Sequence, residues 1–205
     1  MSNLLFLDID GVIVTSRSHC AENAGNMMGG LMTDYDKTAA NFICNFCEAF
    51  CYEIVISSTW RHHPNRLFRL LNKSGMINYL YSPQDITKSF TPELRWSKEN
   101  LKLEEQIEQN PNLVSEIAFS RGLEIKRFLE SIEWDPNDKT LGGRGDRAVI
   151  IDDDSFDLTY WVGKPNVIFV HADCQNGITA KNMREMLVFE GALKENKDDT
   201  SLSRV

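Results

Sequence analysis

Short apolar runs alternate with amphipathic segments along most of the 205 residues. Apolar runs typical of strands buried on both faces occur at residues 3–8, 53–56, 148–151 and 166–170, with a weaker one at 77–81. Apolar residues spaced three or four apart predict helices at about 34–51, 64–75 and 125–132, and from about residue 179 onward. This alternation predicts an α/β fold with a mainly parallel central sheet flanked by helices.

Capping residues and irregular stretches divide the chain further. Thr33 is the expected N-cap of the first helix, and Pro64 and Gly75 are expected to begin and end the second. Residues 15–33 and 82–120 show no regular period, so we expect two small insertions within one domain, 1–193. Residues 194–205 are charged and rich in serine, which predicts a flexible tail.

Composition narrows the class of protein. Acidic residues outnumber basic ones, 30 against 22, and the formal charge of −8 disfavours a general binder of nucleic acids or anionic membranes. No apolar run approaches the roughly 18 residues of a membrane span, and the first residues do not resemble a signal peptide. Five cysteines with irregular spacing fit a reducing compartment. We therefore expect a cytoplasmic protein without membrane insertion.

Acidic and hydroxyl residues follow three of the expected strands. They are Asp8 and Asp10, Ser57 and Ser58, and Asp152 and Asp153. Because ligands of open α/β sheets bind at the carboxyl ends of the strands, these side chains are expected to converge there. Several carboxylates at one point repel unless a cation lies between them, and such oxygen ligands favour Mg²⁺. A carboxylate nucleophile, a metal ion and hydroxyl donors together indicate phosphoryl transfer through an aspartyl-phosphate.

Three motifs carry a resemblance to a known family. LFLDIDGVI resembles the first motif of the haloacid dehalogenase (HAD) superfamily, EIVISS the second and AVIIDDD the fourth, in the same order and strand context. The resemblance extends over about residues 3–190 and implies a Rossmann-like HAD core with a small or absent cap. It also implies an Mg²⁺-dependent phosphatase, because members that lack the second aspartate often are not phosphatases and Asp10 is present here.

The resemblance gives roles to the acidic residues. Asp8 would attack phosphorus, and Asp10 would protonate the leaving group and later activate water. The metal would be held by the carboxylates of Asp8 and Asp152 and by the backbone carbonyl of Asp10. Asp153 would orient these ligands without itself binding the metal.

The same resemblance gives candidates for phosphate binding. Ser57 would bind the transferring phosphoryl group, with Ser58 as the alternative. The third motif of the family is a basic residue near the start of a helix, and Arg121, within Ser-Arg-Gly, resembles its Lys-Gly form. Lys126 is the alternative. An arginine would bind phosphate through a fork of donors that a lysine lacks.

Trp60 and Arg61 directly follow the two serines and are candidate contacts for the leaving group of the substrate. The alternative for Trp60 is packing beneath the next helix. Stacking on an exposed Trp60 would favour an aromatic leaving group, and therefore phosphotyrosine.

Short insertions leave the site open, which favours a phosphate carried by a macromolecule. The resemblance includes small-cap HAD phosphotyrosine phosphatases, some of them bacterial effectors delivered to a host cytosol, and HAD domains of RNA-repair proteins. We expect a phosphoprotein substrate, with phosphotyrosine favoured. The alternatives are a 3′ or 5′ nucleic-acid end, a small phosphate ester, and a non-catalytic phospho-binding module.

The formal charge of −8 is weaker evidence against a nucleic-acid partner once the positions of the acidic residues are considered. Six of the 30 acids belong to the candidate site and its surroundings: Asp8, Asp10, Asp152, Asp153, Asp154 and Asp157. The other 24 nearly balance the 22 basic residues. Bound Mg²⁺ would offset part of the remaining excess.

Overall fold

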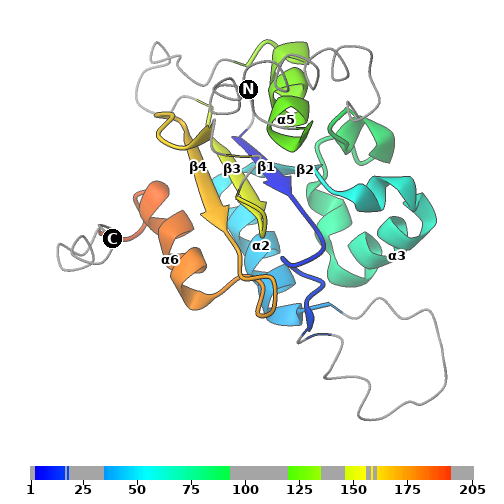
Figure 1. The fold of residues 1–205 in the computed structure, drawn as a ribbon, viewed down its shortest axis with the longest axis horizontal. Helices are drawn as coiled ribbons and strands as arrows, with labels where there is room; N and C mark the ends of the chain where they lie inside the picture. Colours follow the sequence, from blue (N-terminus) through cyan, green and yellow to red (C-terminus); the bar gives the residue numbers. More distant parts are fainter. Residues whose placement is uncertain are drawn as a thin grey trace, which may run out of the picture.

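Four parallel strands form the sheet of the computed structural model, in the order β2-β1-β3-β4 (Figure 1). Their bounds are Asn3–Leu7 for β1, Tyr52–Ile56 for β2, Ala148–Asp152 for β3 and Val167–His171 for β4. The structure describes residues 3–16, 18, 35–92, 120–134, 146–155, 158 and 161–194. The strands match the four main apolar runs of the sequence, so the predicted α/β fold with a parallel sheet is confirmed.

Strand β1 is apolar throughout most of its length because it is central in the sheet. Leu5 and Leu7 belong to the apolar cluster on one face, and Leu4 and Phe6 belong to the cluster on the other. All four are at most 1% exposed. Alternate side chains of a strand point to opposite faces, so burial on both faces requires a continuous apolar run.

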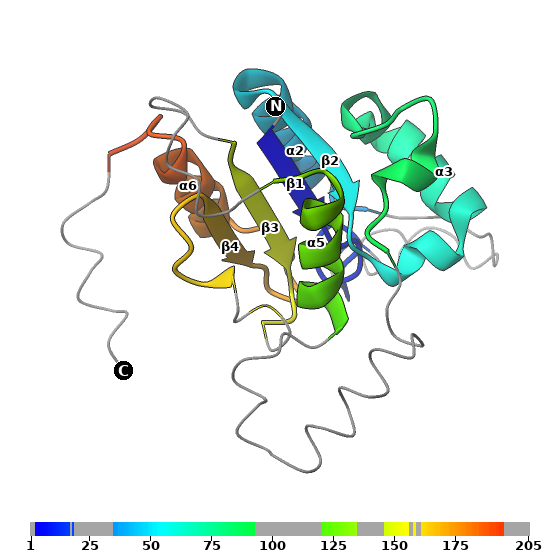
Figure 2. The ribbon, with the colours of Figure 1, turned by 90° about the horizontal axis from the view of Figure 1, so that it is seen from above.

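Helices cover both faces of the sheet (Figure 2). On one face lie α2 (Lys37–Phe50), α3 (Pro64–Ser74) and α6 (Ala180–Phe189), whose buried apolar residues form one cluster with the sheet. On the other face lies α5 (Ser120–Ser131), which packs through Ile125, Phe128 and Leu129. The result is a three-layer arrangement, which leaves the carboxyl edge of the sheet for the loops.

Local capping decides where the helices begin and end. Asp36 is the N-cap of α2, since its carboxylate accepts backbone hydrogen bonds from the first turn. The prediction of Thr33 as this cap is therefore wrong, and Thr33 itself lies outside the described residues. Pro64 begins α3 and Gly75 ends it with φ of 80°, as predicted.

The weak strand predicted at 77–81 is wrong. A 3₁₀ helix, η2 (Met76–Tyr79), begins directly after the left-handed turn at Gly75, so this stretch is not extended. A second 3₁₀ helix, η3 (Ile86–Ser89), follows a turn. Within residues 35–92, this part of the chain meets the outer edge of β2 at two single bridges, made by Leu80 and Phe90.

The predictions for most of the first insertion, for residues 93–119 and for the tail from 195 onward lie outside the described residues. Within the described ranges, no helix combines the length and the apolar character needed to cross a membrane.

Candidate active site

Three strand ends that are far apart in the sequence lie side by side at the carboxyl edge of the sheet. The backbone N–H of Asp8 donates to Ile151 O at 3.0 Å, and that of Ser57 donates to Leu7 O at 2.9 Å. Asp152, the last residue of β3, therefore lies next to the end of β1. The parallel hydrogen-bond ladder thus brings the three predicted motifs to one place.

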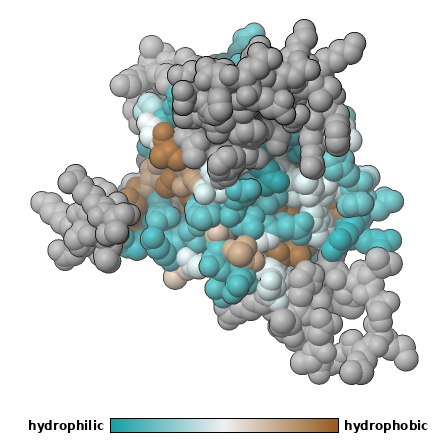
Figure 3. Space-filling view, viewed as in Figure 1, coloured by the Kyte–Doolittle hydropathy of each residue, from teal (hydrophilic) through white to brown (hydrophobic). Residues whose placement is uncertain are grey.

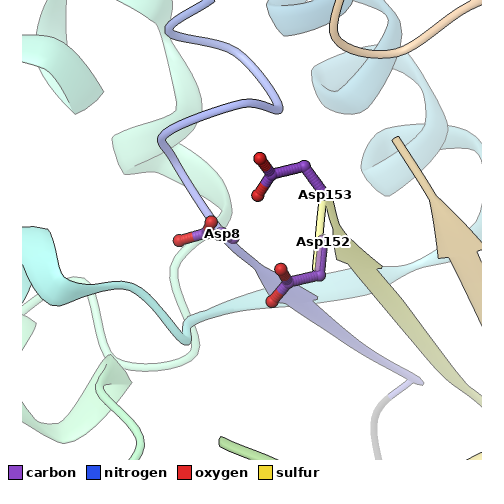
Figure 4. A group of neighbouring side chains, drawn as sticks. All are labelled: Asp8, Asp152 and Asp153. Carbon is purple, nitrogen blue, oxygen red and sulfur yellow. The ribbon is translucent and has the colours of Figure 1, made fainter. Parts of the chain in front are cut away.

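Asp8, Asp152 and Asp153 form a carboxylate cluster at this edge (Figure 4). One oxygen of each carboxylate lies within 4.8 Å of the others. Asp8 and Asp152 are only 5% and 1% exposed. Burial raises the pKa of Asp8 and raises that of Asp152 to about 7, although the nearby Arg121 opposes both shifts. Burial therefore favours the protonated form of both carboxyl groups unless a cation compensates their charge.

Arg121, in the first turn of α5, reaches the centre of this cluster. Its Nη1 lies 2.6 Å from Asp152 Oδ2 and 3.2 Å from Asp8 Oδ2. The alternative basic residue, Lys126, has a side chain 44% exposed and lies 3.9 Å from Glu130 Oε1 on the same helix. The structure thus brings Arg121, and not Lys126, to the candidate nucleophile.

The donor set of the cluster fits a hard divalent cation. Three carboxylates supply only oxygen ligands, and two of them are buried, so a divalent cation would compensate charges that water does not reach. Asp153 was expected to orient the metal ligands without binding the metal itself. Its carboxylate, however, lies within 4.8 Å of those of Asp8 and Asp152. It is therefore a third candidate ligand for Mg²⁺.

Asp10 lies on the loop after β1, and its side chain is exposed. An exposed carboxylate two residues beyond the buried Asp8 is accessible for proton exchange with a substrate. The carboxylate of Asp10 is not part of the three-residue cluster. The expected metal contact through its backbone carbonyl stays a prediction.

Gly11 makes room for Asp153. Its φ is 72°, and a Cβ atom built on it would overlap the carboxylate of Asp153. The glycine is therefore needed both for its backbone conformation and for the close approach of a candidate metal ligand.

We expect Gly11→Ala to weaken Mg²⁺ binding by about tenfold or more, because Asp153 must move away from the cluster. Isothermal titration with Mg²⁺ and thermal unfolding would measure this. Gly75→Ala is the matched control, since Gly75 also has positive φ but has no atom within 4 Å of an added Cβ. The control should lose stability from backbone strain alone. Equal Mg²⁺ affinity in the two variants would contradict the role of Gly11.

The two serines at the end of β2 have different surroundings. Ser58 hydrogen-bonds the Asp8 carboxylate and, as N-cap, begins the 3₁₀ helix η1 (Thr59–His62). Ser57 is 1% exposed, and its Oγ has no hydrogen-bond partner among the described residues. A buried hydroxyl without a partner is unfavourable unless a ligand supplies one. This favours Ser57 for contact with a phosphoryl oxygen.

Trp60 and Arg61 do not lie as predicted for substrate contacts. Trp60 is 3% exposed in the apolar cluster, and the Arg66 guanidinium lies 4.0 Å from the centre of its ring. The structure therefore agrees with the alternative interpretation, in which Trp60 packs beneath the next helix, because Arg66 of α3 covers its ring. Arg61 is paired with Glu124, so its charge is also already neutralised.

No local sequence pattern indicates the pair of Arg61 and Glu124. Arg61 Nη2 lies 2.8 and 2.9 Å from the two oxygens of Glu124, and Nη1 donates to Thr91 Oγ1 at 3.0 Å. The two charged side chains are 10% and 4% exposed. Because Glu124 follows Arg121 by one turn of α5, this buried pair ties the loop after β2 to the helix that carries Arg121.

His171, at the end of β4, was also not predicted from the sequence. Its Nε2 lies 2.9 Å from the backbone oxygen of Asp153. This contact holds the backbone of the candidate metal ligand from the side opposite β1.

Comparison with known proteins gives one match. The family model described as the HAD domain in Swiss Army Knife RNA repair proteins matches residues 4–183. That range contains every candidate site residue. No curated protein and no solved structure matches the chain.

Proposed function

The chain belongs to the family of HAD domains in Swiss Army Knife RNA repair proteins, and from this premise we propose that it hydrolyses the phosphate at the end of a nucleic-acid strand. The reaction class is phosphomonoester hydrolysis through an aspartyl-phosphate. One observation carries this proposal: at the edge of the sheet the buried Asp8 lies beside Arg121, which it shares with Asp152, and beside the carboxylates of Asp152 and Asp153. This surrounds a candidate nucleophile with both an anion-binding group and a cation-binding group.

Asp8 begins the reaction when one carboxylate oxygen attacks phosphorus. The bond between phosphorus and the ester oxygen breaks, and Asp10 gives its proton to that leaving oxygen. In the second step Asp10 takes a proton from water, and the water oxygen attacks the phosphorus held on Asp8. Inorganic phosphate leaves and Asp8 is restored.

Arg121 and Ser57 act on the oxygens of the phosphoryl group. Arg121 offers a planar fork of donors, and Ser57 offers a buried hydroxyl. Both stabilise the negative charge that is drawn to these oxygens in the transition state. Mg²⁺, held by Asp8, Asp152 and the Asp10 carbonyl with Asp153 beside them, would supply further charge compensation when bound.

Metal removal should abolish the activity. We expect EDTA to lower turnover of p-nitrophenyl phosphate by about a hundredfold or more, and added Mg²⁺ to restore it. Mg²⁺ should also raise the melting temperature, because it binds the folded carboxylate cluster and not the unfolded chain. Ca²⁺ should restore less activity, since it takes more ligands at longer distances. Full turnover in EDTA would contradict the metal requirement.

The burial of Trp60 removes the reason for favouring phosphotyrosine, because the ring offers no free face to an aryl group. The family description, in contrast, favours a nucleic-acid end. The acidic net charge does not oppose this, since six of the acidic residues belong to the candidate site and its surroundings and the other 24 nearly balance the 22 basic ones. We therefore propose a 3′ or 5′ phosphate of a nucleic-acid strand as the substrate.

A substrate panel tests the proposal. Turnover of p-nitrophenyl phosphate decides between an enzyme and a non-catalytic phospho-binding module. Release of phosphate from 3′- and 5′-phosphorylated RNA and DNA oligonucleotides is then compared with phosphotyrosine peptides and sugar phosphates. The highest kcat/KM is expected for an oligonucleotide. Faster hydrolysis of the peptides would overturn the proposed substrate while leaving the reaction class intact.

A further inference from the structure

Basic residues are concentrated in one segment of this acidic protein. Between Glu53 and Asp85 the chain contains no aspartate or glutamate, although the whole chain has a formal charge of −8. The same segment contains Arg61, Arg66, Arg69 and Lys73, as well as two histidines. Arg61 is neutralised by Glu124. The other three all belong to α3.

Arg66, Arg69 and Lys73 form one exposed face of α3, here called the basic face. They are spaced by three and four residues, which places them on the same side of a helix. All three are exposed, and no ion pair among the described residues involves any of them. The surface over α3 is largely hydrophilic in the space-filling view (Figure 3). The face therefore presents three positive charges that no acidic side chain in the described ranges neutralises.

Two ring contacts link the ends of the basic face to the segments that follow β2 and β1, the strands that carry Ser57 and Asp8 at their ends. At one end, the Arg66 guanidinium lies over the ring of Trp60, two residues beyond Ser58. At the other end, the Lys73 ammonium lies 5.7 Å from the centre of the Tyr35 ring. Tyr35 lies beside the loop that follows Asp8, because the next residue donates its backbone N–H to the carbonyl of Ile13. The basic face thus extends between the loops that follow β2 and β1.

We infer that the basic face binds the phosphodiester backbone of a nucleic-acid strand whose terminal phosphate occupies the site at Asp8. The inference rests on the proposed function and adds a location for the rest of the substrate. Seven residues of helix separate Arg66 from Lys73, a distance of about 10 Å along the axis. A stacked strand carries one phosphate per about 3.4 Å, so this face can meet about three phosphates.

Charge complementarity selects this occupant. A phosphopeptide carries an isolated phosphate that Arg121 and Ser57 already accommodate, and it has no regular series of negative charges for a basic helix face. A polynucleotide has such a series on every nucleotide. Contacts with phosphates do not depend on the base, so binding by this face is expected to be independent of sequence.

The test measures binding separately from turnover. A fluorescent, 3′-phosphorylated RNA of about 12 nucleotides is titrated with the Asp8→Asn protein, and anisotropy is followed over a range of salt concentrations. With three phosphate contacts on a single strand, affinity should fall about 20-fold between about 50 and 200 mM salt. Adding Arg66→Gln, Arg69→Gln and Lys73→Gln should lower affinity at low salt about tenfold or more and flatten the salt dependence.

A matched control removes the same number of positive charges at the opposite edge of the sheet, where α6 packs beside β4. Lys181, Arg184 and Lys194 belong to or follow α6, and their replacement by glutamine should leave RNA affinity within about twofold of the parent. Melting temperatures check that both triple variants fold. DNA of the same length is expected to bind by the same face, since it offers the same phosphates.

Three outcomes would overturn the inference. They are unchanged RNA affinity in the α3 triple variant, an equal loss in the α6 control, and displacement of RNA by poly-glutamate as effectively as by unlabelled RNA. Failure of the proposed function is distinguishable, because it appears as absent phosphatase turnover in the wild-type protein. RNA binding through α3 is measured independently, whether or not the wild-type protein shows phosphatase turnover.

Discussion

Asp8→Asn is expected to lower kcat for p-nitrophenyl phosphate by about a thousandfold or more, because asparagine cannot form the aspartyl-phosphate. The substitution keeps the shape of the side chain and removes one buried negative charge. Since burial raises the pKa of Asp8, a neutral group at this position is well tolerated by the fold. Phosphate released at fixed time points would measure the loss of kcat. Thermal unfolding would show a melting temperature close to that of the wild type.

Asp154→Asn is the matched control for this variant. Asp154 is the third acid of the same Asp-Asp-Asp run, but it is exposed and lies outside the carboxylate cluster. Its replacement should change kcat by no more than a few fold. Activity of Asp8→Asn at the wild-type level, or equal losses in the two variants, would disprove the role of Asp8 as nucleophile.

Glu124→Gln is expected to destabilise the protein by about 3–5 kcal/mol, because it leaves the charge of Arg61 buried without a counter-ion. Arg61 has little other compensation, since its Nε already lacks a hydrogen-bond partner among the described residues. In a protein of this size, the melting temperature should fall by about 10 °C. Denaturation by urea, followed by circular dichroism, would give the change in unfolding free energy.

Glu130→Gln provides the control on the same helix. Glu130 lies 3.2 Å from Arg127, but both side chains are about half exposed, so the loss should be less than about 1 kcal/mol. The double variant Arg61→Met/Glu124→Leu should be more stable than Glu124→Gln alone, since it leaves no unpaired charge. A Glu124→Gln protein as stable as Glu130→Gln would contradict the importance of the buried pair.

The position of the candidate site was predictable from local patterns. The apolar runs identified the strands, and the first residues after β1, β2 and β3 supplied Asp8, Ser57 and the two acids of β3 and its loop. Parallel strands place their carboxyl ends at one edge, so the convergence followed from the fold class. The family membership rests on the same motifs, and the family match covers residues 4–183.

The direction and partners of individual side chains were less predictable. Trp60 and Arg61 follow the serines in the sequence, but packing of α3 covers the first and Glu124 neutralises the second. The pair of Arg61 and Glu124 leaves no local trace, because the two residues are 63 positions apart. The choice between Arg121 and Lys126 likewise depended on which side of α5 faces the end of β1.

The sequence by itself determined the strands, most helix boundaries and the chemical groups at the strand ends, because these depend on periodicity and on neighbours within a few residues. Only the tertiary structure decided that Trp60 is core, that Arg61 pairs with Glu124 and that Arg121 reaches Asp8. The physical reason is that burial and ion pairing depend on contacts between segments distant in the chain. The same holds for the basic face of α3, whose link to the segments that follow β2 and β1 depends on two ring contacts.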